Sequence, residues 1–165
     1  MPEFWMDTDS LIKPHRESYR FEVVPQYWDF LKQKAEEGVI GSPELVLDKE
    51  LTSSNPSQAD ALEQWAKPLR GILFLPPDSA TQLRYSDVAQ YVQTNPRFKQ
   101  HWIAPFLAGA DSWLVAYASV LGGRIVTFET PQPLARKPKV PDIAQHFGVN
   151  CVSLWDMLAE LKFKA

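Results

Sequence analysis

The stretch Phe-Trp-Met-Asp-Thr-Asp-Ser at residues 4–10 joins a short apolar run to an acidic residue. Three large apolar side chains in succession predict a buried strand that ends at Asp7. The same arrangement returns at residues 124–128, where Arg-Ile-Val-Thr-Phe predicts a second strand, followed by Glu129. Ligands of parallel sheets bind beyond the carboxyl ends of the strands. We therefore expect Asp7 and Glu129 at one edge of the sheet.

Outward from these two strands, the pattern alternates between strands and helices. Shorter strands are expected at 39–40, 72–75 and 151–152, and helices at 25–38, 42–51, 59–67, 79–93, 111–121, 141–147 and 153–163. The second of these helices is expected to begin with Ser42 as its N-cap and Pro43 in its first turn. Such alternation predicts an α/β fold around a mainly parallel central sheet. A chain of 165 residues suits a single domain, 1–165.

The composition predicts a cytoplasmic protein that does not enter a membrane. A membrane-spanning helix requires about 18 consecutive apolar residues, and the sequence contains no such stretch. The start Met-Pro-Glu-Phe-Trp-Met-Asp lacks the basic residues and long apolar core of a signal peptide. The single cysteine, Cys151, has no partner for an internal disulfide, which fits a reducing compartment.

The net charge of −3 argues against a protein that binds nucleic acid through an overall positive charge. That objection is weaker for a metal-dependent nuclease, whose own acidic cluster lowers the net charge. Local cations occur in two groups, which serve either as substrate contacts or as ordinary solvated surface. They are Lys13, His15, Arg16 and Arg20, and then Arg136, Lys137 and Lys139.

Four acidic residues follow or open apolar segments across the whole chain: Asp7, Glu50, Asp111 and Glu129. Carboxylate oxygens are the ligands that Mg²⁺ and Mn²⁺ prefer, and hard cations held in this way promote attack on phosphodiesters. Each acid also has an ordinary structural interpretation. Asp111 precedes a helix and suits an N-cap, Glu50 suits a solvated helix face, and Glu129 suits a turn.

Met-Asp-Thr-Asp-Ser-Leu-Ile (6–12) places an Asp between a hydrophobic residue and a later Leu-Ile pair. This segment resembles the opening motif of PIN-domain nucleases, and in particular of a PIN-like family once described only as a domain of unknown function. The resemblance continues through the aromatic-rich segment 19–31 and then through 110–118, 125–130 and 139–149. It covers most of the chain and is weakest over 52–105.

The resemblance implies a three-layer α/β/α fold and an endoribonuclease that depends on Mg²⁺ or Mn²⁺. Many relatives are VapC-like toxins, each silenced by a small antitoxin protein, and dimerisation is common among them. The four acidic positions of the family match Asp7, Glu50, Asp111 and Glu129, and a frequent threonine matches Thr127. Metal contact would fall to Asp7, Asp111 and Glu129 with the neighbouring Asp9. Arg16 and Arg20, with Thr127, are candidates for positioning the substrate.

Two features depart from the family pattern. Asp9 stands where Asn or Ser is commoner, and it either strengthens metal binding or caps the turn. The second acid is ambiguous, because Glu44, Asp48 and Glu50 lie in one short predicted helix. Glu50 fits the sequence pattern of the family around its second acid best.

Two other functions compete with the nuclease. Asp7-Thr8-Asp9 resembles the Asp-x-Asp motif of haloacid-dehalogenase-type phosphatases, in which the first Asp attacks phosphorus. The chain lacks the later pair of acids that holds Mg²⁺ in those enzymes. A PIN-like module that binds a partner without catalysis is the second alternative. Nothing in the sequence separates RNA from DNA as the substrate.

Overall fold

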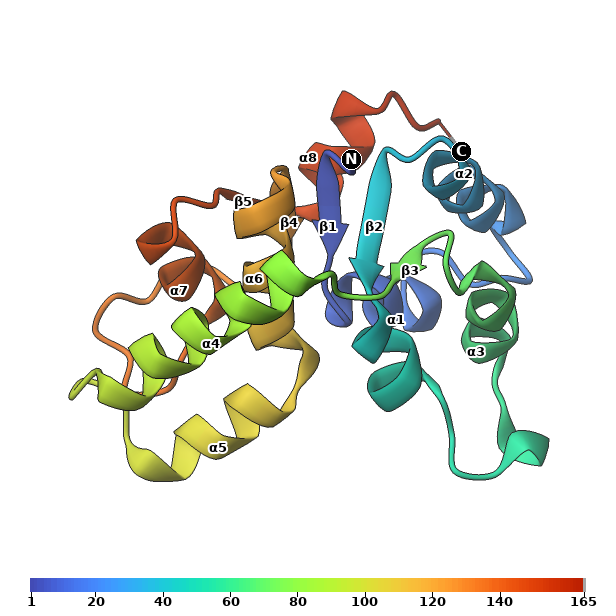
Figure 1. Ribbon diagram of the computed structural model, residues 1–165. Coiled ribbons are helices and arrows are strands. Elements are labelled where there is room, and N and C mark those ends of the chain that lie inside the picture. Colours follow the sequence, from blue (N-terminus) through green and yellow to red (C-terminus); the bar gives the residue numbers. More distant parts are fainter. Residues whose placement is uncertain (165) are drawn as a thin grey trace.

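Five parallel strands form the middle layer of a three-layer α/β/α structure (Figure 1). The computed structural model describes residues 1–164. The strand order is β3-β2-β1-β4-β5. The strands are β1 (Phe4–Met6), β2 (Ile40–Pro43), β3 (Phe74–Leu75), β4 (Arg124–Val126) and β5 (Cys151–Val152). The predicted fold class, α/β with three layers and a parallel sheet, is confirmed.

The central strand β1 is buried on both faces. Phe4, Trp5 and Met6 are each 0% exposed. Because successive side chains of a strand point to opposite faces, Phe4 and Met6 enter one apolar cluster and Trp5 enters the other. This explains why three consecutive large apolar residues make a strand here, as in other parallel sheets covered on both sides.

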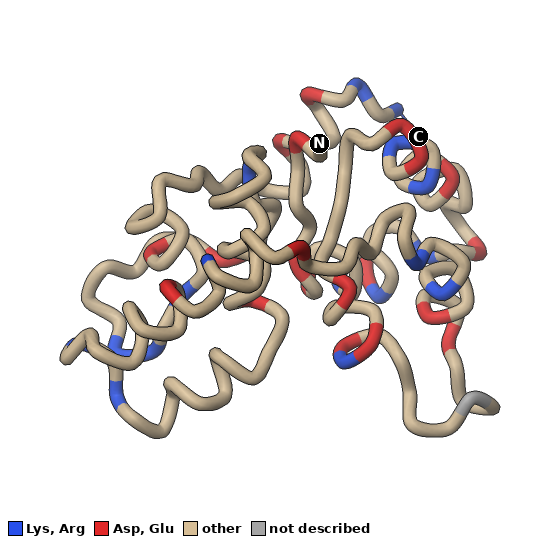
Figure 2. The backbone as a smooth tube through the Cα atoms, in the orientation of Figure 1, with Lys and Arg blue, Asp and Glu red and all other residues tan. Residues whose placement is uncertain are grey.

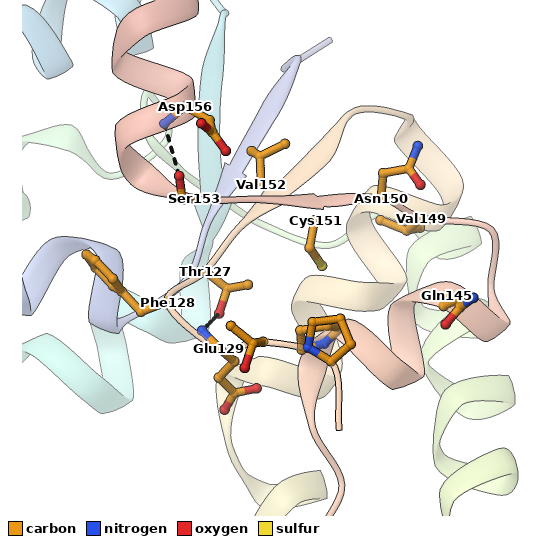
Figure 3. Close-up of a pocket in the computed structure, with 13 residues that line it drawn as sticks. Thr127, Phe128, Glu129, Gln145, Val149, Asn150, Cys151, Val152, Ser153 and Asp156 are labelled. Atoms are coloured by element: carbon orange, nitrogen blue, oxygen red, sulfur yellow. Dashed lines mark hydrogen bonds between the residues drawn. The ribbon is translucent and has the colours of Figure 1, made fainter. Parts of the chain in front are cut away.

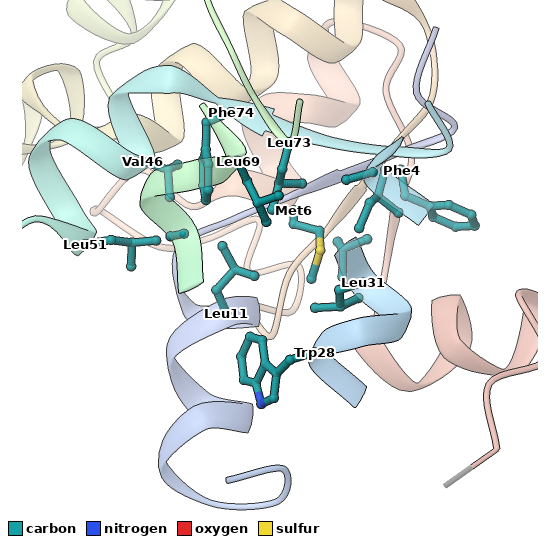
Figure 4. Packing of buried hydrophobic residues seen from close by; sticks show 14 of the residues in the cluster. Phe4, Met6, Leu11, Trp28, Leu31, Val46, Leu51, Leu69, Leu73 and Phe74 are labelled. Carbon is teal, nitrogen blue, oxygen red and sulfur yellow. The ribbon is translucent and has the colours of Figure 1, made fainter. Parts of the chain in front are cut away.

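Helices cover the two faces as two groups (Figure 1). The first group packs on the cluster that contains Phe4 and Met6, seen in Figure 4. It comprises α1 (Asp9–Arg16), α2 (Pro25–Glu36), α3 (Ala61–Ala66) and α8 (Leu154–Glu160). The second group packs on the cluster that contains Trp5. It comprises α4 (Ser79–Thr94), α5 (Gln100–Ala108), α6 (Ala110–Leu121) and α7 (Val140–His146).

Three further helical segments lie between β2 and β3. They are the π-helical segment η1 (Val46–Leu51) and the short 3₁₀ segments η2 (Pro56–Gln58) and η3 (Lys67–Leu69). Most predicted elements appear close to their expected bounds. The expected start of the 42–51 helix is wrong, however, because Ser42 and Pro43 belong to β2. The Ser42 hydroxyl donates to the Met6 carbonyl (2.8 Å), and the Ser42 N–H donates to the Leu73 carbonyl (2.8 Å). Both groups therefore form hydrogen bonds within the sheet and do not cap a helix.

Two helices were not expected from the sequence, α1 and α5. Each contains an internal proline, Pro14 in α1 and Pro105 in α5. Proline removes a helical hydrogen bond and so masks the helical pattern of the residues around it. Both helices matter for the site, since α1 begins two residues after Asp7 and α5 ends directly before α6.

Among residues 1–164, no single helix is long and apolar enough to cross a membrane. The consecutive helices α5 and α6 together meet the length and composition, but they are bent by 66° at their junction.

The turn from α6 into β4 depends on Gly123, which adopts a positive φ of +96°. A Cβ at this position would lie 2.7 Å from the Pro2 carbonyl oxygen, which is backbone and cannot turn aside. Gly71 also has a positive φ, +81°, but a Cβ there would meet nothing within 4 Å.

We expect Gly123→Ala to lower the free energy of unfolding by more than about 2 kcal/mol, since it combines backbone strain with a clash. Gly71→Ala carries the strain alone and should cost about 1 kcal/mol. Urea unfolding of the two variants measures the difference. Equal losses would show that the approach of Pro2 to Gly123 is not a constraint.

Candidate active site

Asp7 is fixed at the point where β1 turns into α1. Its N–H donates to the Val126 carbonyl of β4 (3.1 Å), which extends the pairing of the two central strands by one residue. One carboxylate oxygen, Oδ1, accepts the Ser10 N–H (2.8 Å), and the Ser10 hydroxyl donates to the Asp7 carbonyl (2.7 Å). The residue is 5% exposed. An acid is thus held in place at the carboxyl end of the middle strand.

Glu129 is held by the loop beyond β4. Its N–H donates to the Thr127 hydroxyl (3.1 Å), and its Oε2 accepts the N–H of Val140 (2.8 Å), the first residue of α7. Thr127 is buried, and its side chain also acts on Asp7, whose pKa it lowers. Thr127 therefore connects the two acids that follow the central strands.

Asp111 lies in the first turn of α6, but it is not the N-cap. The extended residue Gly109 precedes the helix, and α6 begins at Ala110. The expectation of a capping role for Asp111 is wrong for this reason. Its half-buried side chain lines a cavity that it shares with Asp7.

Glu50 reaches the same cavity from η1. A Cβ on Gly109 would lie 3.8 Å from Glu50 Oε1, so this carboxylate stands beside the start of α6. The two other acids of the predicted helix turn elsewhere. Asp48 and Glu44 both pair with Arg70 (3.6 Å from Nη1 to Glu44 Oε1), and neither lines the cavity. Of the three acids, the structure therefore brings Glu50 to Asp7 and Asp111.

Together these elements enclose a cavity of about 350 Å³ at the carboxyl edge of the sheet. Its wall carries five carboxylates. It is lined by Asp7, Thr8, Asp9, Ile12, Glu50, Pro105, Phe106, Gly109, Ala110, Asp111 and Glu129. Within the described part of the chain, none of the five acids forms an ion pair. No ion pair among the described residues therefore offsets the negative charge of this cavity.

The pKa values of two cavity acids are raised, as expected where negative charge is buried and crowded. Burial raises the pKa of Asp7 to about 6, against the opposing effect of hydrogen bonds from Thr127 and Ser10. Burial also raises the pKa of Asp111 to about 7, and repulsion from Asp7, Glu129, Asp9 and Glu50 adds to it. Desolvation and like charges both disfavour the ionised form of a carboxyl. A cation in the cavity would reverse this balance.

The donor chemistry suits a hard divalent cation, although the side chains do not form a closed cage as they stand. Among residues 1–164, no three His, Cys, Asp or Glu side chains are close enough together to hold one ion. The five acids nevertheless offer only oxygen ligands, which Mg²⁺ and Mn²⁺ prefer, and they carry charge that needs a counter-ion. These residues therefore fit a bound cation of this kind.

None of the three residues predicted to position the substrate is among those that line the cavity, and Thr127 lines a neighbouring cavity instead. Arg16 and Arg20 are exposed at the end of α1 and beyond it, and Arg20 Nε donates to the Arg16 carbonyl (3.3 Å). The sequence interpretation missed the apolar wall formed by Pro105 and Phe106 of α5. The apolar run at 102–108 was the available signal, and Pro105 obscured its helical character.

A second cavity, of about 480 Å³, adjoins the acidic one and shares Glu129 with it (Figure 3). It opens along β5 and the start of α8, and Cys151 lines it. Burial raises the pKa of the Cys151 thiol to about 12, so this side chain keeps its proton at neutral pH. A thiolate is the nucleophilic form of cysteine, so burial disfavours the reactive form of Cys151.

One comparison with known proteins places the chain in a family. The family described as "Domain of unknown function (DUF4411)" matches residues 4–165. The chain belongs to this DUF4411 family. No curated protein matches it. The DUF4411 match covers the whole sheet and all five acids of the cavity, and the description of the family assigns no activity.

Without divalent cations, we expect the protein to lose stability as the pH rises. A carboxyl whose pKa is higher in the folded chain than in the unfolded chain stabilises the fold at low pH. That contribution is lost as the pH rises from about 4 through the raised values of about 6 and about 7. Urea unfolding in EDTA should show a fall of a few kcal/mol between about pH 5 and about pH 8.

Asp111→Asn should flatten this pH dependence and raise stability at about pH 8, because it removes one of the crowded charges. Asp29→Asn is a matched control, since Asp29 is exposed on α2 and is not among the residues that line the cavity. A pH dependence that is the same in both variants would show that the carboxylates of the cavity are not under mutual repulsion.

Proposed function

We propose that the protein is a metal-dependent nuclease that hydrolyses phosphodiester bonds at the acidic cavity. The observation that supports this proposal is the set of five carboxylates, without ion-pair partners in the described part of the chain, that face one cavity at the carboxyl edge of a parallel sheet. Such an edge is where open α/β sheets bind ligands. The resemblance of the acidic segments to PIN-domain nucleases points to the same reaction.

Asp7, Asp111 and Glu129, with Asp9, would hold Mg²⁺ or Mn²⁺. When bound, the cation supplies Lewis acidity to the phosphate and lowers the pKa of a coordinated water. Asp7 is kept rigid by Ser10, so its carboxylate is oriented before a ligand arrives. One oxygen of Glu129 is engaged by the Val140 N–H, and the other stays available. Glu50, exposed at the rim, is suited to complete the shell or to order a water.

The surroundings of the acids restrict how a substrate enters. Phe106, Pro105 and Ile12 form an apolar wall beside the carboxylates. An apolar wall excludes water and strengthens the electrostatic interactions within the cavity. The scissile phosphate would therefore approach from the open side of the cavity.

RNA is the proposed substrate, by resemblance to the PIN-domain endoribonucleases, and DNA is an alternative outcome of the test. The same resemblance supports a toxin role with a small antitoxin as the partner, and a homodimer as the assembly. The single cysteine fits action in a reducing cytoplasm.

Cleavage of a mixed panel of single-stranded and structured RNA by the purified protein tests this proposal. We expect cleavage with Mn²⁺ or Mg²⁺ and none in EDTA. Asp7→Asn and Asp111→Asn should each lower the rate by at least about 100-fold, because each removes a charged ligand of the metal. Circular dichroism would show that both variants remain folded.

Glu50→Gln and Asp48→Asn form a matched pair for the second acid. Both remove one carboxylate from the same short segment, but only Glu50 lines the cavity. Glu50→Gln should lower the rate, whereas Asp48→Asn should leave it within about twofold, because an exposed ion pair contributes little. Full metal-dependent activity of Asp7→Asn would contradict the site. Turnover of a small phosphate monoester with covalent phosphate on Asp7 would instead support a phosphatase.

A toxin role gives a separate expectation in cells. Expression of the wild-type chain alone should slow growth, and Asp7→Asn should restore it, as judged from growth curves at equal protein level. Harmless expression of an active nuclease would remove the toxin role and leave the catalytic proposal intact.

A further inference from the structure

Two basic segments that are far apart in the sequence meet beside α5. Residues 97–99 precede this helix, and residues 133–137 belong to the long loop between β4 and α7. Lys99 N–H donates to the Arg136 carbonyl (3.0 Å), and Arg97 Nη1 donates to the Pro133 carbonyl (2.6 Å). Figure 2 shows Lys and Arg gathered at this end of the molecule, where the turn before α5 meets the loop. We call Arg97, Lys99, Arg136 and Lys137 the basic surface.

The charges of the basic surface have no acidic partners. None of its four residues forms an ion pair with any residue that the structure describes. Lys99, Arg136 and Lys137 are exposed. The chain as a whole carries a net charge of −3, so the positive charge of this surface is a local feature. Unpaired cations of this kind attract a polyanion.

Exposed aromatic rings lie within the basic surface. Lys137 Nζ stands 4.6 Å from the centre of the Trp102 ring, and His101 packs beside that ring at 4.8 Å. Trp102 is 37% exposed. Cations that follow a phosphate backbone, together with aromatic rings on which bases stack, are what single-stranded nucleic acids require of a protein. An acidic protein segment would use the cations and has no comparable need for the rings.

The basic surface is physically connected to the acidic cavity. Helix α5 begins at the basic surface and carries Phe106 in the cavity wall, about 10 Å further along the helix axis. The loop that bears Arg136 and Lys137 begins just after Glu129. It ends at Val140, whose N–H returns to the Glu129 carboxylate (2.8 Å). A strand that lay along α5 would therefore pass from the basic surface to the acids within a few nucleotides.

We propose that the basic surface binds the phosphate backbone of the single-stranded nucleic acid that enters the acidic cavity. The inference rests on the proposed nuclease function and names the part of the chain that holds the strand beside the cut. The surface holds the flanking phosphates, and Trp102 provides a stacking platform for one base.

The test is the binding of a fluorescein-labelled oligouridine of about 12 nucleotides, measured by fluorescence anisotropy between about 50 and about 200 mM salt. Asp7→Asn protein is used so that the probe stays intact. The variant adds Lys99→Gln, Arg136→Gln and Lys137→Gln. The control adds Lys32→Gln, Lys34→Gln and Lys164→Gln, which remove equal charge from α2 and from the end of the chain.

We expect the variant to bind at least about tenfold more weakly than the Asp7→Asn parent and to lose about 2 from the slope of log K against log salt, since each phosphate contact in a single strand contributes about 0.7. The control should keep the affinity of the parent to within about twofold and should leave the slope of log K against log salt unchanged. Trp102→Ala should weaken binding without changing the salt slope, because stacking releases no counter-ions.

Unchanged affinity and slope in the variant would overturn the inference. So would binding of a polyglutamate peptide through these residues with no binding of oligouridine, which would assign the surface to an acidic protein partner. The cleavage assay on otherwise wild-type protein separates this result from the main proposal. If the three substitutions leave the cleavage rate unchanged, only the role of the basic surface is contradicted. If the protein binds oligouridine through this surface but cleaves no nucleic acid, only the nuclease proposal is contradicted.

Discussion

The parallel pairing of β1 with β4 is the constraint on which the rest of this structure depends. Met6 pairs with Val126, so the next residues along both strands, Asp7 and Thr127, leave the sheet side by side. The pairing is held by backbone hydrogen bonds and by the burial of β1, and of Ile125 and Val126 in β4, between two helical layers. A shift of register by one residue would turn Phe4 and Met6 to the opposite face and break both apolar clusters. The positions of Asp7 and Thr127 at the edge of the sheet are therefore fixed by the core of the protein.

The site concentrates like charge that the fold does not neutralise. Carboxyls that are both desolvated and close together have raised pKa values, as Asp7 and Asp111 do, and their ionisation works against folding. Some acids elsewhere in the chain do have a cationic partner, as Asp48 and Glu44 have in Arg70. An acidic cluster without ion-pair partners among residues 1–164, at the edge where parallel sheets bind ligands, is typical of a functional site rather than of a structural one.

Charges of opposite sign are segregated within the molecule. Acids gather in the cavity, while unpaired cations gather where the turn before α5 meets the loop before α7. The two regions are joined by α5 and by the loop between Glu129 and Val140. A net charge of −3 hides both features, because it averages over regions of opposite sign. Bulk charge is thus a weak guide to partners when the charge is segregated in this way.

The amino-acid sequence by itself determined the fold class, the buried strands and the acids Asp7 and Glu129, because an apolar run that ends in a charge is a local feature of the chain. It did not determine whether Ser42 caps a helix or serves the sheet, since that depends on a Met6 carbonyl far away in the sequence. It also left α1 and α5 hidden behind their internal prolines. The choice of Glu50 over Asp48 and Glu44 required the position of Arg70, and the basic surface required the contact of residues 97–99 with the 131–139 loop. Only the tertiary structure decides which of these side chains meet, because a charge interacts with the groups that are near it in space, whatever their distance in sequence.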